Sequence, residues 1–191
     1  MKSTQAIVIA VVVVLGVAAL VIGGIKMQGN GAEAARPAAE TSGDDHDHSA
    51  VHTAPDFTLK TLGGEEVTFS EARKGKVAIL KFGALWCGWC QKQAEEFAKL
   101  QPKLDPEKTI IFEVSVSNDE PVEKVREHAK KKGLVHTIVR DENDKAASKY
   151  GVEFLPTLFV ISPDGHVVWK GAYTEAEKLA KIVEQAHAHQ H

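Results

Sequence analysis

The chain has 191 residues, of which 43% are hydrophobic and 26% are charged, and this composition suits one ordinary domain with its own core. The formal net charge is −3, so the chain lacks the basic field that attracts nucleic acid, and no nucleic-acid partner is expected. The two cysteines lie together in one short motif, which excludes a disulfide-stapled scaffold and indicates chemistry at these thiols.

The N-terminal segment, residues 1–26, is expected to anchor the protein in a membrane. Residues 6–25 form an uncharged run of twenty small and apolar residues, and a helix of this length spans the roughly 30 Å of a bilayer core. The alternative is a signal peptide cleaved near Ala32-Glu33-Ala34. Basic residues flank the run on both sides and leave the orientation open. The export-type N-terminus favours a single-pass protein of the cell membrane with its C-terminal domain on the extracytoplasmic, periplasmic side.

Residues 27–53 are expected to form a flexible tether. The segment consists mainly of Gly, Ala, Glu, Asp, Ser and His, with almost no large apolar residues. Such a composition does not offset the entropy lost on ordering. The sequence therefore predicts an acidic, histidine-containing tether that leads into a domain at residues 54–186, followed by a histidine-rich tail at residues 187–191.

The domain is predicted to alternate strands and helices. In chain order we expect strands at residues 66–70 and 77–82, a helix at 91–100, a strand at 110–116, a helix at 121–132, a strand at 137–140, a helix at 145–150, strands at 158–161 and 167–170, and a helix at 175–186. The Pro-Asp-Gly sequence between the last two strands is typical of a hairpin turn. This order predicts an α/β fold with a central mixed sheet flanked by helices on both faces.

The sequence Trp86-Cys87-Gly88-Trp89-Cys90 carries the expected chemistry. It follows an apolar strand directly and opens a helix, so backbone N–H groups and the helix dipole stabilise a thiolate at Cys87. Cys87 is the predicted nucleophile, and Cys90 is the predicted resolving thiol that attacks a mixed disulfide and releases the partner. A closed zinc site is the alternative, but it needs four ligands and the chain has no second cysteine pair.

The two tryptophans of the motif have two interpretations. They are either packing aromatics or part of a flat apolar platform that binds a partner's polypeptide. Their position on both sides of Cys87 favours the platform.

These features resemble the TlpA/ResA-type branch of the thioredoxin-like superfamily over about residues 54–186. The resemblance rests on the strand ending in Phe82, the two-cysteine motif, Leu155-Pro156-Thr157, the closing hairpin and the entry segment at residues 54–59. It implies a thioredoxin-like fold and a redox-active disulfide between Cys87 and Cys90. An N-terminal anchor is also common in this branch.

The resemblance assigns further site residues. Pro156 matches the proline that follows a cis peptide bond beside the cysteines, and this bond turns the backbone of Leu155 toward an extended substrate peptide, with Thr157 next to it. Thioredoxins often carry a buried acid at the position of Lys81, and their lysine partner corresponds to Glu113. We therefore expect an ion pair with exchanged signs, in which Lys81 donates and Glu113 accepts a proton. The alternative is that both side chains reach solvent.

Histidines gather at both ends of the chain. The candidates for metal ligation are His46, His48 and His52 in the tether and His187, His189 and His191 in the tail. They predict at most weak binding of Cu or Zn, and a solvated polar tail is the alternative. No other cofactor is expected beyond the disulfide.

The expected function is thiol-disulfide exchange with disulfides of exported proteins, as a reductant, with apocytochrome c cysteines among the substrates. A membrane thiol partner is expected to supply electrons. The alternative is a copper-handling thiol protein in the assembly of a respiratory copper centre, because a dithiolate suits Cu(I). A peroxidase is disfavoured, because residues 83–86 lack the Thr and Pro that precede the reactive cysteine in such enzymes.

Overall fold

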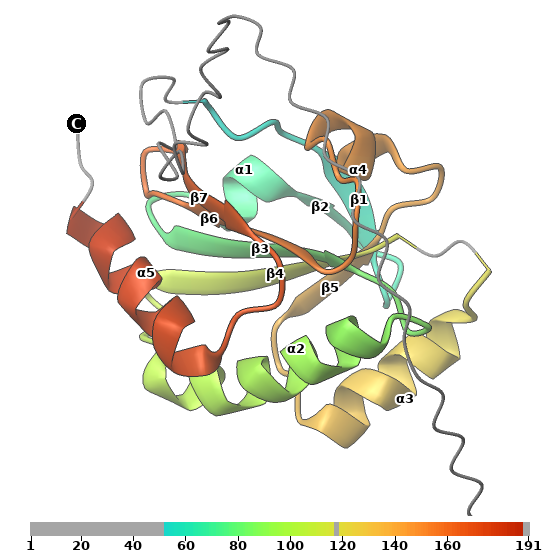
Figure 1. The fold of residues 1–191 in the computed structure, drawn as a ribbon. Coiled ribbons are helices and arrows are strands. Elements are labelled where there is room, and N and C mark those ends of the chain that lie inside the picture. The colour runs from blue at the N-terminus through green and yellow to red at the C-terminus, as the bar shows by residue number, and fades with distance from the viewer. Residues whose placement is uncertain (1–51, 117–118, 189–191) are drawn as a thin grey trace, which may run out of the picture. The chain divides into compact units, whose positions relative to one another are not determined.

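A seven-stranded mixed sheet forms the centre of the domain in a computed structural model that describes residues 52–116 and 119–188 (Figure 1). The strand order is β2-β1-β5-β4-β3-β6-β7. The strands are β1 (Thr58–Thr61), β2 (Glu66–Thr68), β3 (Val77–Gly83), β4 (Thr109–Ser115), β5 (Thr137–Arg140), β6 (Thr157–Ile161) and β7 (Val167–Gly171). The helices are α1 (Phe69–Ala72), α2 (Gly88–Leu100), α3 (Val122–Lys132), α4 (Lys145–Lys149) and α5 (Ala176–Ala188), with the 3-10 helix η1 (Gln101–Lys103) after α2.

The central strands β3, β4 and β5 are parallel, and the outer strands pair antiparallel with their neighbours. Every residue of β3 is buried, because helices cover both faces of the sheet at this strand (Figure 1). The α/β fold with a central mixed sheet and helices on both faces, as predicted from the sequence, is confirmed.

Side chains of β3 alternate between two hydrophobic clusters. Ala78, Leu80 and Phe82 pack into the cluster that includes residues of α1 and α4. Val77 and Ile79 pack into the cluster that includes residues of α2 and α5. Because strand side chains repeat every two residues, position 81 also faces the α2 side of the sheet. This alternation decides where Lys81 points.

The predicted strand at residues 66–70 is wrong in its second half, which forms the short helix α1. Asp56 accepts hydrogen bonds from the backbone N–H and the hydroxyl of Ser70, at 2.9 and 2.6 Å. Phe69 is buried and stacks on Phe57 with ring centroids 4.9 Å apart. The helix therefore depends on two residues that lie more than ten positions earlier, and local propensity does not reveal them.

Other elements agree with the sequence to within a few residues. The helix predicted at residues 91–100 begins earlier, at Gly88, and the helix predicted at residues 121–132 ends at Gly133, whose φ of 66° is the left-handed C-cap conformation. The strand β1 was not predicted as a strand.

Both predicted domain boundaries need correction. At the start, the carbonyl of His52 accepts a hydrogen bond from Val167 N–H at 2.9 Å, and Thr53 forms a β-bridge with His166. The ordered unit therefore begins before residue 54. At the end, α5 continues to Ala188, so the domain does not stop at residue 186.

Within the described parts of the chain, 52–116 and 119–188, no helix is long and apolar enough to cross a membrane. The anchor predicted at residues 1–26 and the tether up to residue 51 lie outside the described residues.

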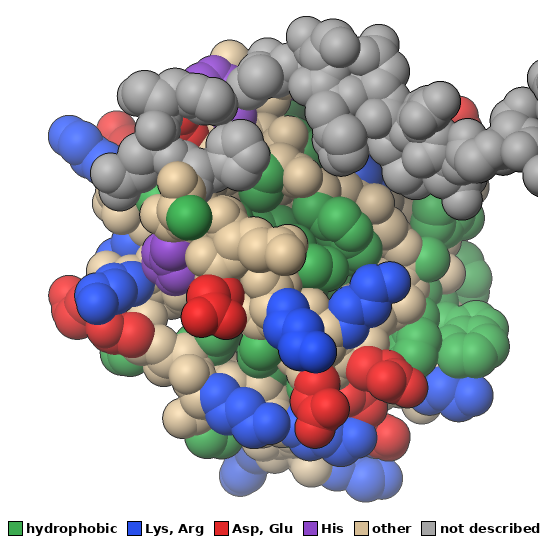
Figure 2. Space-filling view, turned by 60° about the vertical axis from the view of Figure 1, so that its left-hand side comes forward, with side chains coloured by type: hydrophobic (Ala, Val, Ile, Leu, Met, Phe, Trp, Pro, Cys, Tyr) green, Lys and Arg blue, Asp and Glu red, His purple; other side chains and the backbone are tan. Residues whose placement is uncertain are grey.

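Figure 2 brings the left-hand side of Figure 1 forward and shows acidic and basic side chains intermixed on that side of the domain.

Candidate active site

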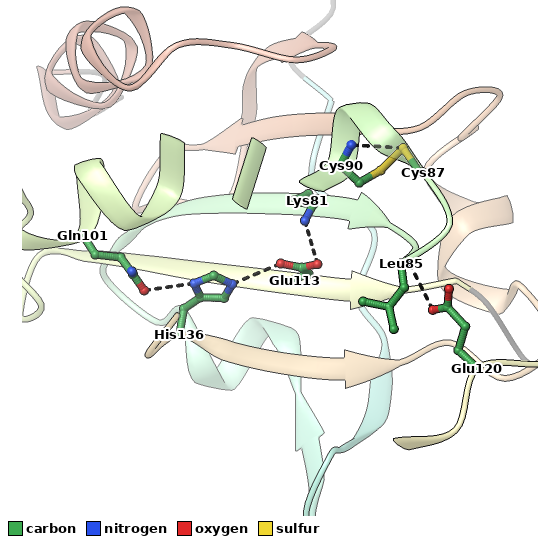
Figure 3. A network of polar contacts seen from close by, with 8 residues as sticks. All are labelled: Lys81, Leu85, Cys87, Cys90, Gln101, Glu113, Glu120 and His136. Atoms are coloured by element: carbon green, nitrogen blue, oxygen red, sulfur yellow. Dashed lines mark hydrogen bonds and ion pairs between the residues drawn. A yellow bond between two sulfur atoms is a disulfide. The ribbon is translucent and has the colours of Figure 1, made fainter. Parts of the chain in front are cut away.

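The cysteine pair lies where β3 passes into α2. Cys87 is the N-cap residue of α2, and its Sγ accepts a hydrogen bond from Cys90 N–H at 3.1 Å (Figure 3). The two cysteines form a disulfide with their Cα atoms 5.2 Å apart. Cys87 is 7% exposed and Cys90 is 3% exposed. The position at a helix N-terminus stabilises a thiolate at Cys87, and its greater exposure agrees with its predicted role as the attacking thiol.

The Leu155–Pro156 peptide bond is cis, as the resemblance implied. Thr157, the next residue, begins β6 and lies opposite Phe82 near the end of β3, which leads to the cysteines. The side chain of Thr157 is fully buried, and its hydroxyl donates a hydrogen bond to the carbonyl of Phe154. The prediction that Thr157 contacts substrate is therefore wrong, because this side chain holds the loop in place from within.

The tryptophans of the motif are exposed, Trp86 by 71% and Trp89 by 55% of their surface. This degree of exposure contradicts the alternative that they are packing aromatics. Trp89 contacts the ring of Tyr173, with centroids 5.3 Å apart, and Lys92 Nζ lies 4.1 Å from its centroid. These neighbours restrict the orientation of the Trp89 ring while leaving much of it accessible.

A hollow lies beside Trp86 on the same side as the cis peptide bond. Its wall is mainly apolar and carries two acidic groups: the lining residues are Trp86, Val116, Asp144, Ala147, Ser148, Val152, Glu153, Phe154 and Leu155. Phe154 is 50% exposed and extends the apolar surface. Exposed aromatics next to a groove provide a surface for a polypeptide.

Lys81 and Glu113 lie opposite each other on the parallel strands β3 and β4. Lys81 Nζ donates a hydrogen bond to Glu113 Oε1 at 2.7 Å, and the two side chains are only 2% and 13% exposed. The predicted pairing is present, and the alternative that both side chains reach solvent is wrong. Burial would raise the pKa of Glu113, but the Lys81 charge and the His136 contact outweigh burial and lower the pKa to about 2.

His136 extends this pair to a third side chain, which the sequence did not reveal. Its Nε2 lies 3.1 Å from Glu113 Oε2, and its Nδ1 lies 3.1 Å from Oε1 of Gln101 (Figure 3). Only 4% of the His136 side chain is exposed. His136 precedes β5, which pairs with β4, and only this strand pairing brings it next to Glu113.

A water-sized cavity lies beside Cys90. It is lined by Lys81, Gly83, Ala84, Leu85, Cys90, Gln91, Glu113, Ser115, Val125, His128, Leu134 and Ile138. The cavity therefore joins the resolving cysteine to the buried ion pair. Burial lowers the pKa of His128, which reaches the cavity from α3.

Glu120 is a further site residue that the sequence did not reveal. Its carboxylate accepts a hydrogen bond from the backbone N–H of Leu85 at 3.1 Å (Figure 3) and another from the backbone N–H of Trp86 at 3.0 Å. These contacts fix the loop that presents Cys87. No local sequence signal links Glu120 to this loop, because the residues are more than thirty positions apart.

The predicted metal ligands do not meet in the part of the chain that the structure describes. Residues 52–116 and 119–188 contain no group of three or more His, Cys, Asp or Glu side chains placed to hold a metal ion. His187 belongs to α5 rather than to a flexible tail, and its Nε2 lies 3.0 Å from the hydroxyl of Thr109. His52 is exposed. The remaining candidates, His46, His48, His189 and His191, lie outside the described residues, and weak metal binding by the chain ends stays a prediction.

Comparison with known proteins agrees with this geometry. A model of the AhpC/TSA family matches residues 51–170, more than half of the chain. This chain belongs to the AhpC/TSA family. "Thioredoxin-like protein YneN" of Bacillus subtilis (strain 168) is 33% identical over 132 residues, which cover 68% of this chain and 76% of that protein.

"Thiol-disulfide oxidoreductase ResA" of Geobacillus thermodenitrificans (strain NG80-2) is 36% identical to this AhpC/TSA family member over 115 residues. The match covers 60% of this chain but only 64% of the ResA protein. The resemblance to ResA-type proteins predicted from the sequence is confirmed at the level of the family.

Solved structures show the same fold. A thioredoxin family thiol:disulfide interchange protein from Chlorobium tepidum TLS superimposes with a TM-score of 0.63 at 24% identity, covering 72% of this chain and 97% of that one. A secreted disulfide oxidoreductase of Mycobacterium tuberculosis gives a TM-score of 0.60 at 20% identity, covering 68% and 95%. The family member described here therefore has a thioredoxin-like fold.

Proposed function

We propose that this chain is a thiol-disulfide oxidoreductase that exchanges its Cys87–Cys90 disulfide with disulfides of other proteins. One observation carries the proposal: the disulfide lies at the N-terminus of α2, within the motif that holds the exposed Trp86 and Trp89. A helix N-terminus favours the thiolate that such exchange requires. The name of the ResA relative supports the same reaction.

The exchange has two steps. In the reduced protein, the Cys87 thiolate attacks one sulfur of a substrate disulfide, forms a mixed disulfide and releases the other substrate sulfur as a thiolate. Cys90 then loses its proton and attacks Cys87 Sγ, which forms the intramolecular disulfide and releases the second substrate sulfur with its electron pair. Two electrons pass from the protein to the substrate, and both substrate sulfurs end as thiols after taking up protons.

Protein substrates fit this site better than small disulfides. Trp86, Trp89 and Phe154 are exposed apolar side chains, and Trp86 and Phe154 line the hollow together with Leu155. Leu155 lines this hollow, and its backbone is the edge that would pair with an extended peptide. We infer that substrates present their cysteines in extended or unfolded segments, as apocytochrome c does.

We further propose that the protein acts as a reductant outside the cytoplasm, anchored by residues 1–26. The apolar run at residues 6–25 supports the anchor. Reduction in that compartment consumes electrons, so a membrane thiol protein is the proposed donor that reduces the Cys87–Cys90 disulfide after each cycle. A reporter enzyme that is active only outside the cytoplasm, fused after residue 191, tests the orientation: activity supports it, and an inactive but stable fusion contradicts it.

The deciding experiment combines turnover with a potential. The chain, supplied with dithiothreitol, is expected to reduce the interchain disulfides of insulin catalytically, and Cys87→Ser and Cys90→Ser each abolish this turnover. Equilibration with glutathione or dithiothreitol buffers then gives the reduction potential of the pair. A reduction potential of about −270 mV, as in thioredoxin, supports a reductant, whereas a potential of about −120 mV, as in strong oxidants, contradicts that direction. Absence of turnover in the unaltered chain contradicts the function itself.

A further inference from the structure

A row of polar contacts runs through the domain from below Cys90 to the far end of the sheet. Lys81 contacts Glu113, Glu113 contacts His136, and His136 contacts Gln101 (Figure 3). The cysteines lie beyond the C-terminal end of β3, whereas His136 precedes the first residue of β5. The two steps of thiol exchange described above assign no role to these side chains, so the contact between Glu113 and His136 needs its own explanation.

The row of polar contacts is open at its end nearest the disulfide, because residue 83 has no side chain. A Cβ atom at Gly83 would lie 3.4 Å from Cys90 Sγ, 3.4 Å from Lys81 Nζ and 2.8 Å from Lys81 Cε. The space between the sulfur and the ammonium group is therefore kept free of carbon, and it belongs to the water-sized cavity. A water molecule in such a polar cavity would join Cys90 Sγ to Lys81 Nζ.

At the other end of the row of polar contacts, Gln101 fixes one proton on His136. The Gln101 amide is oriented by two backbone contacts: its Nε2 donates to Gly133 O at 3.3 Å, and its Oε1 accepts from Val135 N–H at 2.9 Å. His136 Nδ1 faces the same Oε1, an acceptor, so Nδ1 carries a hydrogen. His136 Nε2 faces a carboxylate oxygen, and two lone pairs would oppose each other unless a second proton lies between these atoms.

The polar contacts therefore describe a network in which Lys81 is protonated and a further proton lies between Glu113 and His136 while the disulfide is formed. Lys81 is an ammonium group, and Glu113 and His136 share one further proton. The sum of the charges is +1. Reduction of the disulfide leaves a sulfur at Cys90 that needs a proton, and the loaded network lies one water-sized cavity away.

We propose that the Lys81–Glu113–His136 network stores the proton of Cys90, holding it while the Cys87–Cys90 disulfide exists and returning it to Cys90 Sγ when the disulfide is reduced. The proposal rests on the thiol exchange proposed above and deepens it. His136 acts through Glu113 and Lys81, and its second ring proton is the one that moves.

The protons and electrons balance over the cycle. When a donor reduces the disulfide, Cys90 leaves with the electron pair of the S–S bond and takes a proton from Lys81 through the cavity. Lys81 regains a proton from Glu113, and the proton shared with His136 is used up. When Cys90 later attacks the mixed disulfide, its proton returns along the same path to the Glu113–His136 contact, and the substrate sulfur leaves as a thiolate.

Other titratable groups face this network from neighbouring elements. His128 on α3 lines the same cavity. The charges of Glu113 and Lys81, followed by those of Lys132 and Glu120, act electrostatically on His128. Glu113 Oε2 lies within hydrogen-bond distance of His136 Nε2, whereas Glu113 acts on His128 through its charge. His128 is therefore the comparison residue for the assignment, and His166, in the turn between β6 and β7, is the control.

The first test uses the unaltered full chain. Nitrogen-15 NMR of the histidine rings, recorded at neutral pH with the protein oxidised and then reduced, distinguishes doubly from singly protonated imidazole. We expect the His136 ring to be doubly protonated in the oxidised form and to lose the Nε2 proton on reduction, while the signals of His166 stay unchanged. A His136 ring with the same protonation in both forms overturns the proposal.

The second test measures Cys90 alone and needs no turnover. In a Cys87→Ser background, ultraviolet absorbance of the thiolate is followed against pH, with and without His136→Gln. Loss of the proton store is expected to lower the thiolate fraction of Cys90 about tenfold at a given pH, which moves the titration midpoint up by about one unit. His166→Gln is expected to leave the midpoint in place, and His128→Gln is expected to move it clearly less than His136→Gln does.

An unchanged midpoint in folded His136→Gln overturns the proton store, and so does a shift produced by His128→Gln in its place. Circular dichroism checks the fold of each variant, and if His136→Gln does not fold, the NMR comparison of the unaltered chain decides. Neither measurement involves a substrate protein. Failure of the proton store therefore leaves insulin reduction intact, whereas failure of the proposed function appears only in the insulin assay.

Discussion

Lys81 donates a hydrogen bond to Glu113 across two central parallel strands over 2.7 Å, and only 2% of the lysine is exposed. Neither group could keep its charge at this depth without the other. The pair lies in register on β3 and β4, on the face of the sheet that α2 covers. The ion pair is therefore part of the core and also lines the same cavity as the resolving cysteine.

Glu113→Gln is expected to lower the free energy of unfolding by about 3–5 kcal/mol, because it leaves the Lys81 charge buried without a partner. Urea unfolding at neutral pH measures this loss. The control is the double variant Lys81→Met with Glu113→Leu, which removes both charges and is expected to be clearly more stable than Glu113→Gln. Equal losses in the two variants would show that packing, not charge pairing, holds this part of the core.

The same carboxylate predicts how stability falls in acid. The pKa of Glu113 is about 2 in the folded protein, against 4.5 for the ordinary side chain. A lowered folded-state pKa contributes stability above the unfolded value, and this contribution disappears as the pH falls from about 4.5 toward 2. Unfolding measured across this range is expected to show a loss of stability that Glu113→Gln lacks. Parallel pH curves for the two proteins would contradict the lowered pKa.

Trp86→Ala and Trp89→Ala are expected to raise KM for insulin by about tenfold each, because exposed aromatics at the centre of an interface commonly contribute more than about 1 kcal/mol. Stability is expected to change by less than about 0.5 kcal/mol, as for other surface positions. Val135→Ala is the matched control, since Val135 is 86% exposed but lies among residues of a different hollow. A similar KM increase in the control would mean that the effect is not specific to the motif.

Gly83→Ala is expected to destabilise the protein by about 1–3 kcal/mol, because a small-to-large change in a packed site forces its neighbours to move. The added Cβ would come within 2.8 Å of Lys81 Cε. Resolution of a mixed disulfide, followed by stopped-flow fluorescence, is expected to slow as well. Gly88→Ala is the matched stability control, since nothing lies within 4 Å of its Cβ position. A stable, fast Gly83→Ala protein would show that this space is not needed.

Cys90→Ala is expected to accumulate a mixed disulfide with insulin through Cys87, because the resolving thiol is missing. Mass spectrometry of the acid-quenched reaction detects the adduct and identifies the linked cysteine. The reciprocal variant, Cys87→Ala, is expected to trap much less, since Cys90 is only 3% exposed. More adduct at Cys90 than at Cys87 would reverse the assigned roles.

The sequence predicted most of the sheet because its strands and helices carry strong local patterns. The buried strand β3 and the helix stop at Gly133 are examples. The failures share one cause, which is dependence on distant residues. The helix α1 needs Asp56 to bind Ser70, and β1 exists because it pairs with β2 and β5.

The candidate site shows the same division. Cys87, Cys90 and the cis bond before Pro156 follow from motifs that can be recognised along the chain. The Lys81–Glu113 pair was predicted by comparing one departure from the family pattern with another. Glu120 and His136 were missed, because only the three-dimensional arrangement brings them to the loop before Cys87 and to the carboxylate of Glu113.

The short stretch before β1 has a protective consequence for the sheet. β7 is an edge strand, and edges with free N–H and C=O groups invite pairing with other polypeptides. Residues 52–54 bond to the start of β7 and to the turn before it, through His52 O with Val167 N and Ala54 N with Gly165 O. A shortened protein that lacks residues 52–54 would uncover the start of this edge strand, so it would self-associate more readily at high concentration.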